Sequence, residues 1–322
     1  MSRRPLRVVS YNVRYFGHAL KGLATTRRSM EGIAHGLARL SPVADVVCFQ
    51  EVETRSLRST LALPKHSHTQ LEAFMAALEA EFARVKRPFP YQAYHFPAHT
   101  YRFRRTTLYT TGLAVLINTD HLTVEGHNVR APHPITHHHV ERLRDTKQSR
   151  ICAHVRLTTS SGRALHVFNT HLSLPTPFTR SFWSAGGKMG FGPNQVHEAR
   201  KLVAFVQSLA GRDPFVVAGD FNSPPASPVY RYLTEEAQWN GAQERLRQID
   251  AGARAAFPTA GFFRLRMHLD HLFGGNGIRW VDLEGTAPFG AGPFRGLSDH
   301  IPLIARFHVA GQAAVPRADD VA

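Results

Sequence analysis

Polar side chains recur in this sequence at the ends of short apolar runs that have the composition of buried strands. Carboxylates and histidines among them are groups that hold hard divalent cations and transfer protons. Open α/β sheets present their loops at strand ends, so side chains from separate runs can converge there on one pocket. The residues concerned are Asn12, Glu51, Asn169, His171, Asp220, Asn222, Asp270, His271, Asp299 and His300.

The donor types in this set favour phosphoryl chemistry. Oxygen atoms of Asn, Asp and Glu side chains suit Mg²⁺, with Mn²⁺ as a second choice. Such an ion neutralises a phosphate, while an Asp orients or deprotonates water and a His donates to the developing charge. The stretch nearest to a zinc motif, HPITHHH at 133–139, is interpreted as a surface loop. The sequence therefore predicts a Mg²⁺-dependent site.

Each of these residues also has an ordinary structural interpretation. Asp270 could be a helix cap or a surface charge, and His171 could be a satisfied histidine of the core. The sequence GDFN at 219–222 could be a strand that ends in an Asx turn. The joint occurrence of the whole set, in order and at strand ends, is what indicates a catalytic site.

Hydrophobic periodicity predicts the elements that would position these residues. Runs rich in Val, Ile, Leu and Phe predict strands, and a 3.6-residue period predicts helices over 25–40, 70–85 and 194–210. Early strands alternate with helices, whereas 110–172 reads as consecutive strands. We therefore expect an α/β protein in which helices cover packed sheets. The predicted strands are 6–13, 44–50, 112–118, 151–157, 164–172, 214–221, 269–273 and 301–309.

Two stretches follow neither pattern and are expected to be irregular. Residues 86–109 mix basic and aromatic side chains, and residues 173–193 have a loop-like composition with several aromatics. Loops of that length inside a domain are usually functional or disordered, and the aromatic content argues against disorder. Within the first stretch, RFRR at 102–105 could contact substrate phosphates through Arg102, Arg104 and Arg105, or it could be a solvated strand edge.

Composition excludes several protein classes. With 43% hydrophobic and 20% charged residues the chain reads as globular, and no run reaches the ~20 apolar residues of a membrane helix. The N-terminus has no signal-peptide pattern, so we expect a cytoplasmic protein. Cys48 and Cys152 lie in strand-like runs and are expected to be buried thiols. We expect one catalytic domain over 1–310 and a flexible tail over 311–322.

The formal net charge of +15 favours polyanionic partners. Nucleic acid, anionic lipid and phosphorylated small molecules all fit this charge. An arginine-rich proteome would produce the same charge without such a partner. No obligate protein partner is predicted.

The ordered motifs resemble the endonuclease/exonuclease/phosphatase superfamily, which has the fold of deoxyribonuclease I. The resemblance covers about residues 6–309. It implies a four-layer α/β/β/α sandwich, in which two packed mixed β-sheets are flanked by helices and the active site lies at one edge. The motifs that carry it are SYNVR at 10–14, FQEV at 49–52, NTHLS at 169–173, GDFNSPPASPVY at 219–230, LDHLF at 269–273 and SDHIPL at 298–303.

The resemblance implies roles for single residues at a metal and at the attacked phosphate. Asn12, Glu51 and Asp299 match positions at the metal, and Glu51 matches its principal ligand. Asp220 and Asn222 match the pair that orients the attacking water and the scissile phosphate.

Two histidines match family positions, and one of them indicates which branch of the family the chain resembles. His300 matches a general base or phosphate donor, with Asp270 as its carboxylate partner, while His171 is expected to be catalytic and Asn169 to contact substrate. Apurinic endonucleases have a tyrosine at the position of His171, so the chain looks like the deoxyribonuclease I, sphingomyelinase and deadenylase-like branches.

The sequence departs from the family pattern at two positions. Apurinic endonucleases often have an acidic residue where this chain has Arg14, which disfavours DNA-repair specificity. An aromatic residue is usual at the position of His271, which is interpreted as a tolerated neighbour or as an extra phosphate contact. The glutamate that pairs with the deoxyribonuclease I counterpart of His171 has no match that the sequence identifies.

Together these observations predict a metal-dependent hydrolase of phosphate esters, and most readily a nuclease or phosphodiesterase acting on nucleic acid or nucleotide. A sphingomyelinase-like or phosphoinositide-directed enzyme is the alternative. Aromatic side chains at Phe182, Trp183 and Phe191 would then enter the lipid interface, with Arg180 and Lys188 at the headgroups. A non-catalytic binding protein on the same fold is the third possibility.

Overall fold

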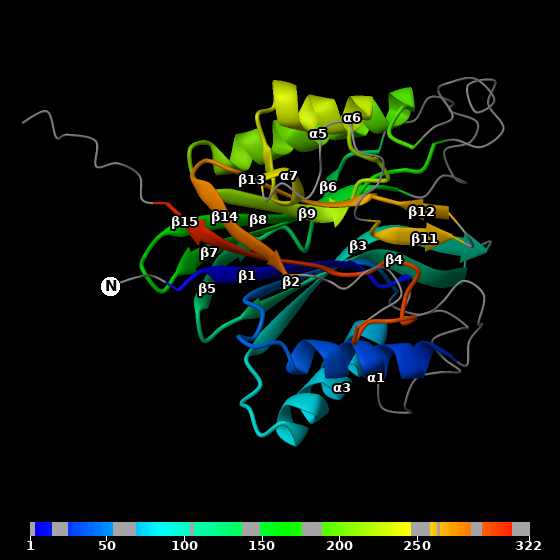
Figure 1. Ribbon diagram of the computed structural model, residues 1–322. Coiled ribbons are helices and arrows are strands. Elements are labelled where there is room, and N and C mark those ends of the chain that lie inside the picture. The colour runs from blue at the N-terminus through cyan, green and yellow to red at the C-terminus, as the bar shows by residue number, and fades with distance from the viewer. Residues whose placement is uncertain are drawn as a thin grey trace, which may run out of the picture.

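Two β-sheets stacked face to face, with helices on both outer faces, form the architecture in the computed structural model of this protein (Figure 1). The expected α/β fold with two packed mixed sheets is confirmed. The structure describes residues 4–14, 25–53, 69–103, 106–136, 149–175, 189–245, 258–262, 265–284 and 292–310. The expected C-terminal tail, 311–322, lies outside these ranges.

The first and the last strand of the chain lie next to each other inside the first sheet. Its strand order is β14-β15-β1-β2-β4-β3, and the β1–β2 pair is parallel while the other pairs are antiparallel. Its strands are β1 (Leu6–Asn12), β2 (Val46–Glu53), β3 (Tyr91–Phe103), β4 (Thr106–Asn118), β14 (Ile278–Glu284) and β15 (Leu303–Val309).

The second sheet has one parallel pair, β8–β9, at its centre. Its order is β10-β13-β9-β8-β7-β5, and β6 pairs with β7. Strands β11 (Ala260–Phe262) and β12 (Leu265–Met267) form a separate ribbon. The strands of the second sheet are β5 (Leu122–His127), β6 (His133–Pro134), β7 (Ile151–Thr159), β8 (Ala164–His171), β9 (Phe215–Asp220), β10 (Asn240–Gly241) and β13 (Asp270–Gly275).

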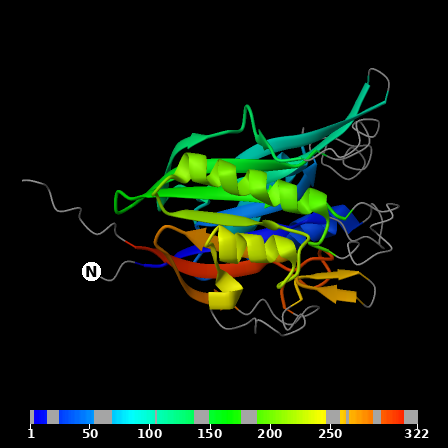
Figure 2. The same ribbon diagram turned by 90° about the horizontal axis from the view of Figure 1, so that it is seen from above.

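The helices of the two outer layers pack on opposite sheets (Figures 1 and 2). Helices α1 (Thr25–Ala38) and α3 (Gln70–Arg84) cover the first sheet. Helix α5 (Pro193–Ala210) covers the second sheet together with the short α6 (Pro228–Arg231) and the π-helical turn Tyr232–Glu236. A further turn, α7 (Ala242–Arg245), lies beside β13. No helix within the described residues is long and apolar enough to span a membrane.

Local sequence explains where α3 begins and which face it buries. Thr69 accepts a hydrogen bond from the backbone N–H of Glu72, and the Glu72 carboxylate accepts one from the backbone N–H of Thr69. This capping box satisfies donors that the first helical turn leaves free. Phe74 and Leu78, four residues apart, are fully buried against the first sheet, as the 3.6-residue period predicts.

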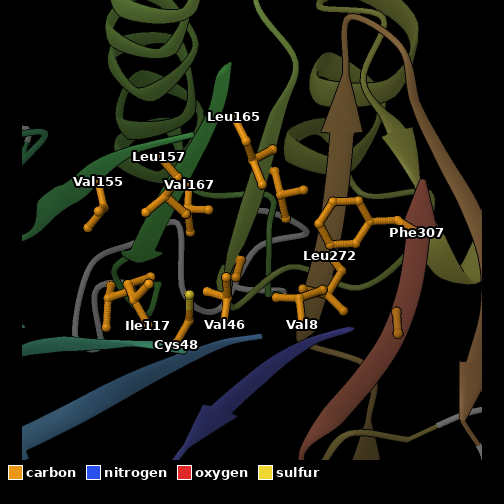
Figure 3. Packing of buried hydrophobic residues seen from close by; sticks show 14 of the residues in the cluster. Val8, Val46, Cys48, Ile117, Val155, Leu157, Leu165, Val167, Leu272 and Phe307 are labelled. Atoms are coloured by element: carbon orange, nitrogen blue, oxygen red, sulfur yellow. The ribbon is translucent and has the colours of Figure 1, made fainter. Parts of the chain in front are cut away.

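A largely apolar layer between the two sheets joins the halves of the sandwich. Branched aliphatic side chains alternate along the strands of both sheets, as inward-facing positions do. Each fully buried side chain of this type contributes about 1.5–3 kcal/mol. Figure 3 labels part of this cluster: Val8, Val46, Cys48, Ile117, Val155, Leu157, Leu165, Val167, Leu272 and Phe307. Both cysteines are buried free thiols, as predicted.

The prediction that 86–109 is irregular was wrong. Most of this stretch belongs to the hairpin of β3 and β4, which extends past the neighbouring strands (Figure 2). Tyr91 and Phe96 are buried, and the Tyr91 hydroxyl donates to the backbone oxygen of Ala44 at 2.8 Å. Strand β3 is an edge strand, where polar residues and a proline are tolerated. Because of these residues, the sequence of β3 lacks the apolar pattern that would have predicted a strand.

Candidate active site

Strand register brings the predicted polar residues to one end of the sandwich. Strands β8 and β9 run parallel, so their carboxyl ends meet, and His171 pairs with Asp220 across them. Strand β13 runs antiparallel to β9 with Asp270 paired to Asp220, so this aspartate starts its strand where β9 ends. Asn12 ends β1 in the facing sheet and approaches Asp220 directly.

Asn12 connects the carboxylates of the two sheets. Its fully buried amide donates from Nδ2 to Glu51 Oε1 at 3.1 Å and to Asp220 Oδ2 at 3.0 Å. Its Oδ1 accepts the backbone N–H of Arg14 at 3.0 Å. The side chain therefore fixes two acidic groups relative to each other before any ligand is present.

Backbone geometry aims the Glu51 side chain out of its strand. The β2–β4 register shifts between Phe49 and Val52, which is a bulge, and Glu51 has a φ of 56°. Left-handed backbone at a residue other than glycine costs about 1 kcal/mol or more and concentrates at functional sites. Arg14 and Asn222 have similar values, with φ of 42° and 48°. Three residues of the site thus share this uncommon conformation.

His300 and Asp270 form a charged pair inside the site. His300 Nδ1 donates to Asp270 Oδ2 at 2.8 Å, and its Nε2 lies 3.8 Å from Asp220 Oδ2. Burial alone would lower the pKa of His300, but the charges of Asp270 and Asp220 together raise it to about 9. The imidazole is therefore protonated at neutral pH and presents Nε2–H to the site.

Asp220 sits between the histidines with an unusual protonation equilibrium. Burial and the charge of Asp270 raise its pKa to about 7, although His300 and the Asn12 amide oppose that rise. A carboxyl group that titrates near neutral pH is suited to exchanging protons with water.

His171 has the opposite charge state to His300. Its Nε2 lies 3.5 Å from Asp220 Oδ2 and 4.0 Å from Glu51 Oε1. Burial, then the positive charges of Arg150 and His300, hold its pKa well below the usual range. The ring is therefore neutral, and one site contains a charged and an uncharged imidazole.

The SDH segment at 298–300 is tied to the end of β1. Ser298 Oγ donates to the backbone oxygen of Asn12 at 2.8 Å and accepts the backbone N–H of His300 at 3.2 Å. The Asp299 carboxylate forms an ion pair with the Arg14 guanidinium. Asp299 thus lies at the site, but with a protein cation as its partner.

Both predicted asparagines of the second sheet are buried and hydrogen bonded within the protein. Asn169 Nδ2 donates to the backbone oxygens of Phe49 at 2.9 Å and Ala114 at 3.1 Å, and its Oδ1 accepts from Gln50 at 2.8 Å. In this arrangement Asn169 bridges the sheets and presents no free polar atom to a substrate. Asn222 donates from Nδ2 to the backbone oxygen of Leu172 at 2.8 Å.

The basic residues predicted to contact substrate phosphates lie largely outside the described part of the chain. Arg104 and Arg105 lie outside the described residues, and Arg102 is described only as part of the β3 backbone. Of the aromatic loop at 173–193, residues 176–188 lie outside the described ranges.

The donors available at this site fit a hard divalent cation. Ligand atoms of Asp220, Asp270 and His300 lie within 4.8 Å of one another. His300 is nevertheless a poor ligand, because it is protonated and paired with Asp270. The Glu51 carboxylate is partly exposed at the mouth of the site and offers the oxygen ligands that Mg²⁺ and Mn²⁺ prefer.

Arg150 is a site residue that sequence reasoning missed. Its side chain is buried, and within the described residues its Nε has no hydrogen-bond partner. It lines a crevice beside Glu51 and His171. Arg150 precedes β7, and β7 runs antiparallel to β8, so the start of β7 lies at the end of β8. Sequence reasoning that considers only residues at the carboxyl ends of strands does not find a residue that precedes a strand. The only sign of Arg150 in the sequence was a single arginine directly before an apolar run.

His271 takes the place of an aromatic side chain in the wall of the site. It is fully buried among the rings of Phe221, Tyr230 and Phe273, and its Nε2 donates to the backbone oxygen of Ser223 at 2.7 Å. Burial lowers its pKa to about 4, so the ring is neutral. The arrangement is that of a packing residue that also holds the segment after Asn222.

The stacked sheets and the acidic, histidine-containing site at their common end define a phosphoesterase of the deoxyribonuclease I-like fold. The chain belongs to the endonuclease/exonuclease/phosphatase family, whose sequence model matches residues 9–300. Family membership confirms the resemblance on which the sequence prediction depended and places the chain among hydrolases of phosphate esters.

Solved structures of low sequence identity share the fold. The catalytic domain of human Nocturnin is 17% identical, with a TM-score of 0.62 and 96% of each chain covered. ANGEL2, a 2′,3′-cyclic phosphatase, is 16% identical, with a TM-score of 0.62 and coverage of 95% of this chain and 96% of ANGEL2. A mannosyl-6-phosphatase from Bacteroides thetaiotaomicron is 15% identical, with a TM-score of 0.59 and coverage of 94% and 99%. No curated protein matches the sequence.

Proposed function

We propose that this protein is a Mg²⁺- or Mn²⁺-dependent phosphodiesterase that hydrolyses nucleic acid or nucleotide substrates by direct attack of water. The observation that carries the proposal is the buried Asp220–His300–Asp270 arrangement. It places a carboxylate with a pKa of about 7 beside an imidazolium with a pKa of about 9. Two groups whose environments separate their protonation states in this way are suited to act as base and acid.

Asp220 is assigned the role of the base. The backbone N–H of Asn222 donates to Asp220 Oδ1 at 3.0 Å, and Asn12 donates to Oδ2. These bonds fix the carboxylate plane, so that an oxygen can accept a proton from an attacking water. A base whose pKa lies near the working pH makes this transfer most effective.

His300 is assigned the role of hydrogen-bond donor to the phosphate. Asp270 holds the ring through Nδ1, which leaves Nε2–H to donate to an oxygen that gains negative charge. The neutral His171 can contribute a second contact. The Nε of Arg150, which has no hydrogen-bond partner among the described residues, can contribute a third. Donors placed before the reaction stabilise such charge most strongly where water is excluded.

Glu51 is assigned as the principal metal ligand, with Asn12 and Asp299 beside it. When bound there, a divalent cation would neutralise the phosphate and stabilise the leaving oxygen. Glu51 suits this role because the bulge in β2 projects it and the Asn12 amide orients its carboxylate.

The net charge of +15 supports a polyanionic substrate, and Arg102, Arg104 and Arg105 are proposed to contact its phosphates. The names of the structural relatives include a 2′,3′-cyclic phosphatase bound to an adenosine vanadate, which favours nucleotides, and a sugar phosphatase, which does not. One feature favours the lipid alternative: Leu174 and Phe191 are 52% and 38% exposed at the two ends of the aromatic loop.

The reaction is tested first with bis(p-nitrophenyl) phosphate. We expect hydrolysis with Mg²⁺ or Mn²⁺ that EDTA stops, and a loss of at least about 10²-fold in each of Glu51→Ala and His300→Ala, the usual scale for such groups. Glu79→Ala, at an exposed acidic residue of α3, serves as the control and should keep activity. Full activity of the site variants in EDTA would overturn the proposal.

A substrate panel then separates the classes. Single-stranded and plasmid DNA, RNA, sphingomyelin vesicles and phosphoinositides are compared at one metal concentration. Turnover of DNA or RNA above the lipids supports the proposal, and the reverse order assigns the lipid alternative. Binding of any of these without turnover would indicate a non-catalytic protein.

A further inference from the structure

The carboxylate of Asp299 is already paired with a protein cation. The Arg14 guanidinium contacts Asp299 Oδ2, and the Asp299 side chain is only 9% exposed. The Ser298 hydroxyl also donates to Asp299 Oδ1, at a longer distance of 3.4 Å. A buried carboxylate is strongly stabilised by a guanidinium in direct contact, because solvent screens such a pair weakly.

Arg14 is held in position by the same residue that orients the metal ligand. Its backbone N–H donates to Asn12 Oδ1, while the other end of the same amide donates to Glu51. The φ of 42° at Arg14 turns the chain immediately after β1. The guanidinium therefore reaches Asp299 from a backbone position fixed by the site itself, and Arg14 is not a loosely placed surface residue.

Positive charge at Asp299 has a consequence for metal binding. The sequence resemblance places both Glu51 and Asp299 at metal positions, yet the Asp299 Oδ2 atom is already in contact with the Arg14 guanidinium, which neutralises the carboxylate charge that a second divalent cation would need. Two cations placed a few ångströms apart also repel each other, and a partly buried site screens that repulsion only weakly.

We propose that Arg14 is a built-in cation that occupies the place of a second metal ion, so that the site binds one divalent cation, at Glu51. The guanidinium then supplies at Asp299 the positive charge that a second ion would otherwise bring to the substrate phosphate. The inference rests on the metal role of Glu51 in the proposed function.

The test counts bound metal without reference to turnover. Mn²⁺ is titrated into the full chain by calorimetry, and free Mn²⁺ is counted by electron paramagnetic resonance. Wild type should bind one Mn²⁺, and Glu51→Gln should lose it. Arg14→Gln should bind a second Mn²⁺ or bind the first at least about tenfold more tightly, because a nearby positive charge is removed. Arg14→Lys should resemble wild type.

A matched variant controls for the loss of one positive charge. Arg306 pairs with Asp282 on β15 and β14, and its side chain is 35% exposed against 34% for Arg14. Arg306→Gln should leave the Mn²⁺ isotherm unchanged. The double variant Arg14→Gln/Asp299→Asn should lose the additional or tighter Mn²⁺ binding, because the carboxylate that Arg14→Gln frees is then absent.

The outcomes separate this inference from the proposed function. Two Mn²⁺ ions in wild type, or identical isotherms for wild type and Arg14→Gln, would overturn the role of Arg14 while leaving hydrolysis unaffected. A wild type that binds one Mn²⁺ at Glu51 but hydrolyses none of the esters would overturn the proposed function instead. The predicted change in Arg14→Gln would still support the inference in that case.

Discussion

At the scale of single residues, the site owes its chemistry to environment rather than to residue type. His171 and His300 both lie within 4 Å of Asp220 Oδ2, yet one ring is neutral and the other is protonated. Burial lowers the pKa of both rings, and their charged neighbours then separate them. Asp270 contacts His300 directly and raises its pKa, whereas the positive charge of Arg150 adds to the effect of burial on His171. One neighbouring carboxylate and one neighbouring guanidinium thus give two imidazole side chains different protonation states and different roles.

The pH dependence of hydrolysis tests this division. Asp220 must be ionised to accept a proton, so the rate should rise as pH rises through about 7. His300 must be protonated to donate, so the rate should fall as pH rises through about 9. In Asp270→Asn the charge that raises both pKa values is lost, and both limbs of the kcat/KM profile should move to lower pH. Asp282→Asn, remote from the site, should leave the profile in place, and unmoved limbs in Asp270→Asn would contradict the assignment.

At the scale of elements, the site depends on how the two sheets are held at one end. The layer between the sheets is apolar along most of its length, but at the active-site end Gln50 and Asn169 replace apolar side chains. Asn169 donates to two backbone oxygens of the facing sheet, one of them on Phe49 at the start of the β2 bulge. The bulge that projects Glu51 is therefore anchored from the other sheet.

Removal of this anchor should cost both stability and activity. Asn169→Ala removes the buried hydrogen bonds that Asn169 makes with the backbone oxygens of Phe49 and Ala114 and with the Gln50 amide, at a cost of about 1–3 kcal/mol in the free energy of unfolding. Urea denaturation measures this loss, and Mn²⁺ affinity should fall as Glu51 loses its fixed position.

Asn276 provides the comparison for Asn169. It also donates to two backbone oxygens, those of Gly211 and Asp213, but it is exposed. Its φ of 50° suits glycine, so Asn276→Gly adds no strain. Water replaces the lost bonds there, and the variant should lose well under 1 kcal/mol. Equal losses at the two positions would show that the inter-sheet anchor has no special role.

Helices and strands with a regular hydrophobic period were predictable from the sequence, whereas an edge strand and a site residue that precedes a strand were not. The strand runs ending at Asn12 and Asp220 and the helix containing Phe74 were correct because burial on one face imposes periodicity. Strand β3 was missed because an edge strand needs no such pattern on its open side. Arg150 was missed because its place depends on strand direction, which a single sequence does not encode locally.

At the scale of the whole molecule, the fold buries more histidine than the active site uses. His95, His154 and His271 lie outside the catalytic group, and burial lowers their pKa values to about 4, about 3 and about 4. His154 Nε2 and His166 Nδ1 are 2.9 Å apart on the outer face of the second sheet. All are neutral in the folded protein, whereas an unfolded chain protonates them near pH 6.5.

Acid should therefore unfold this protein by protonating buried histidines. The pKa values of these histidines are lower in the folded protein than in the unfolded chain. Above about pH 6.5 the rings are neutral in both states, so they do not change the free energy of unfolding. As pH falls from about 6.5 towards about 4, the unfolded chain binds more protons and stability is lost. Each such histidine contributes about 1 kcal/mol per pH unit to this loss. Urea midpoints measured between pH 7.5 and 5 should fall steeply. His271→Phe, which keeps the aromatic packing but removes the titrating ring, should flatten the dependence, whereas His197→Gln at an exposed position of α5 should not. A His271→Phe protein with the wild-type slope would mean that His271 does not contribute to the acid sensitivity of the fold.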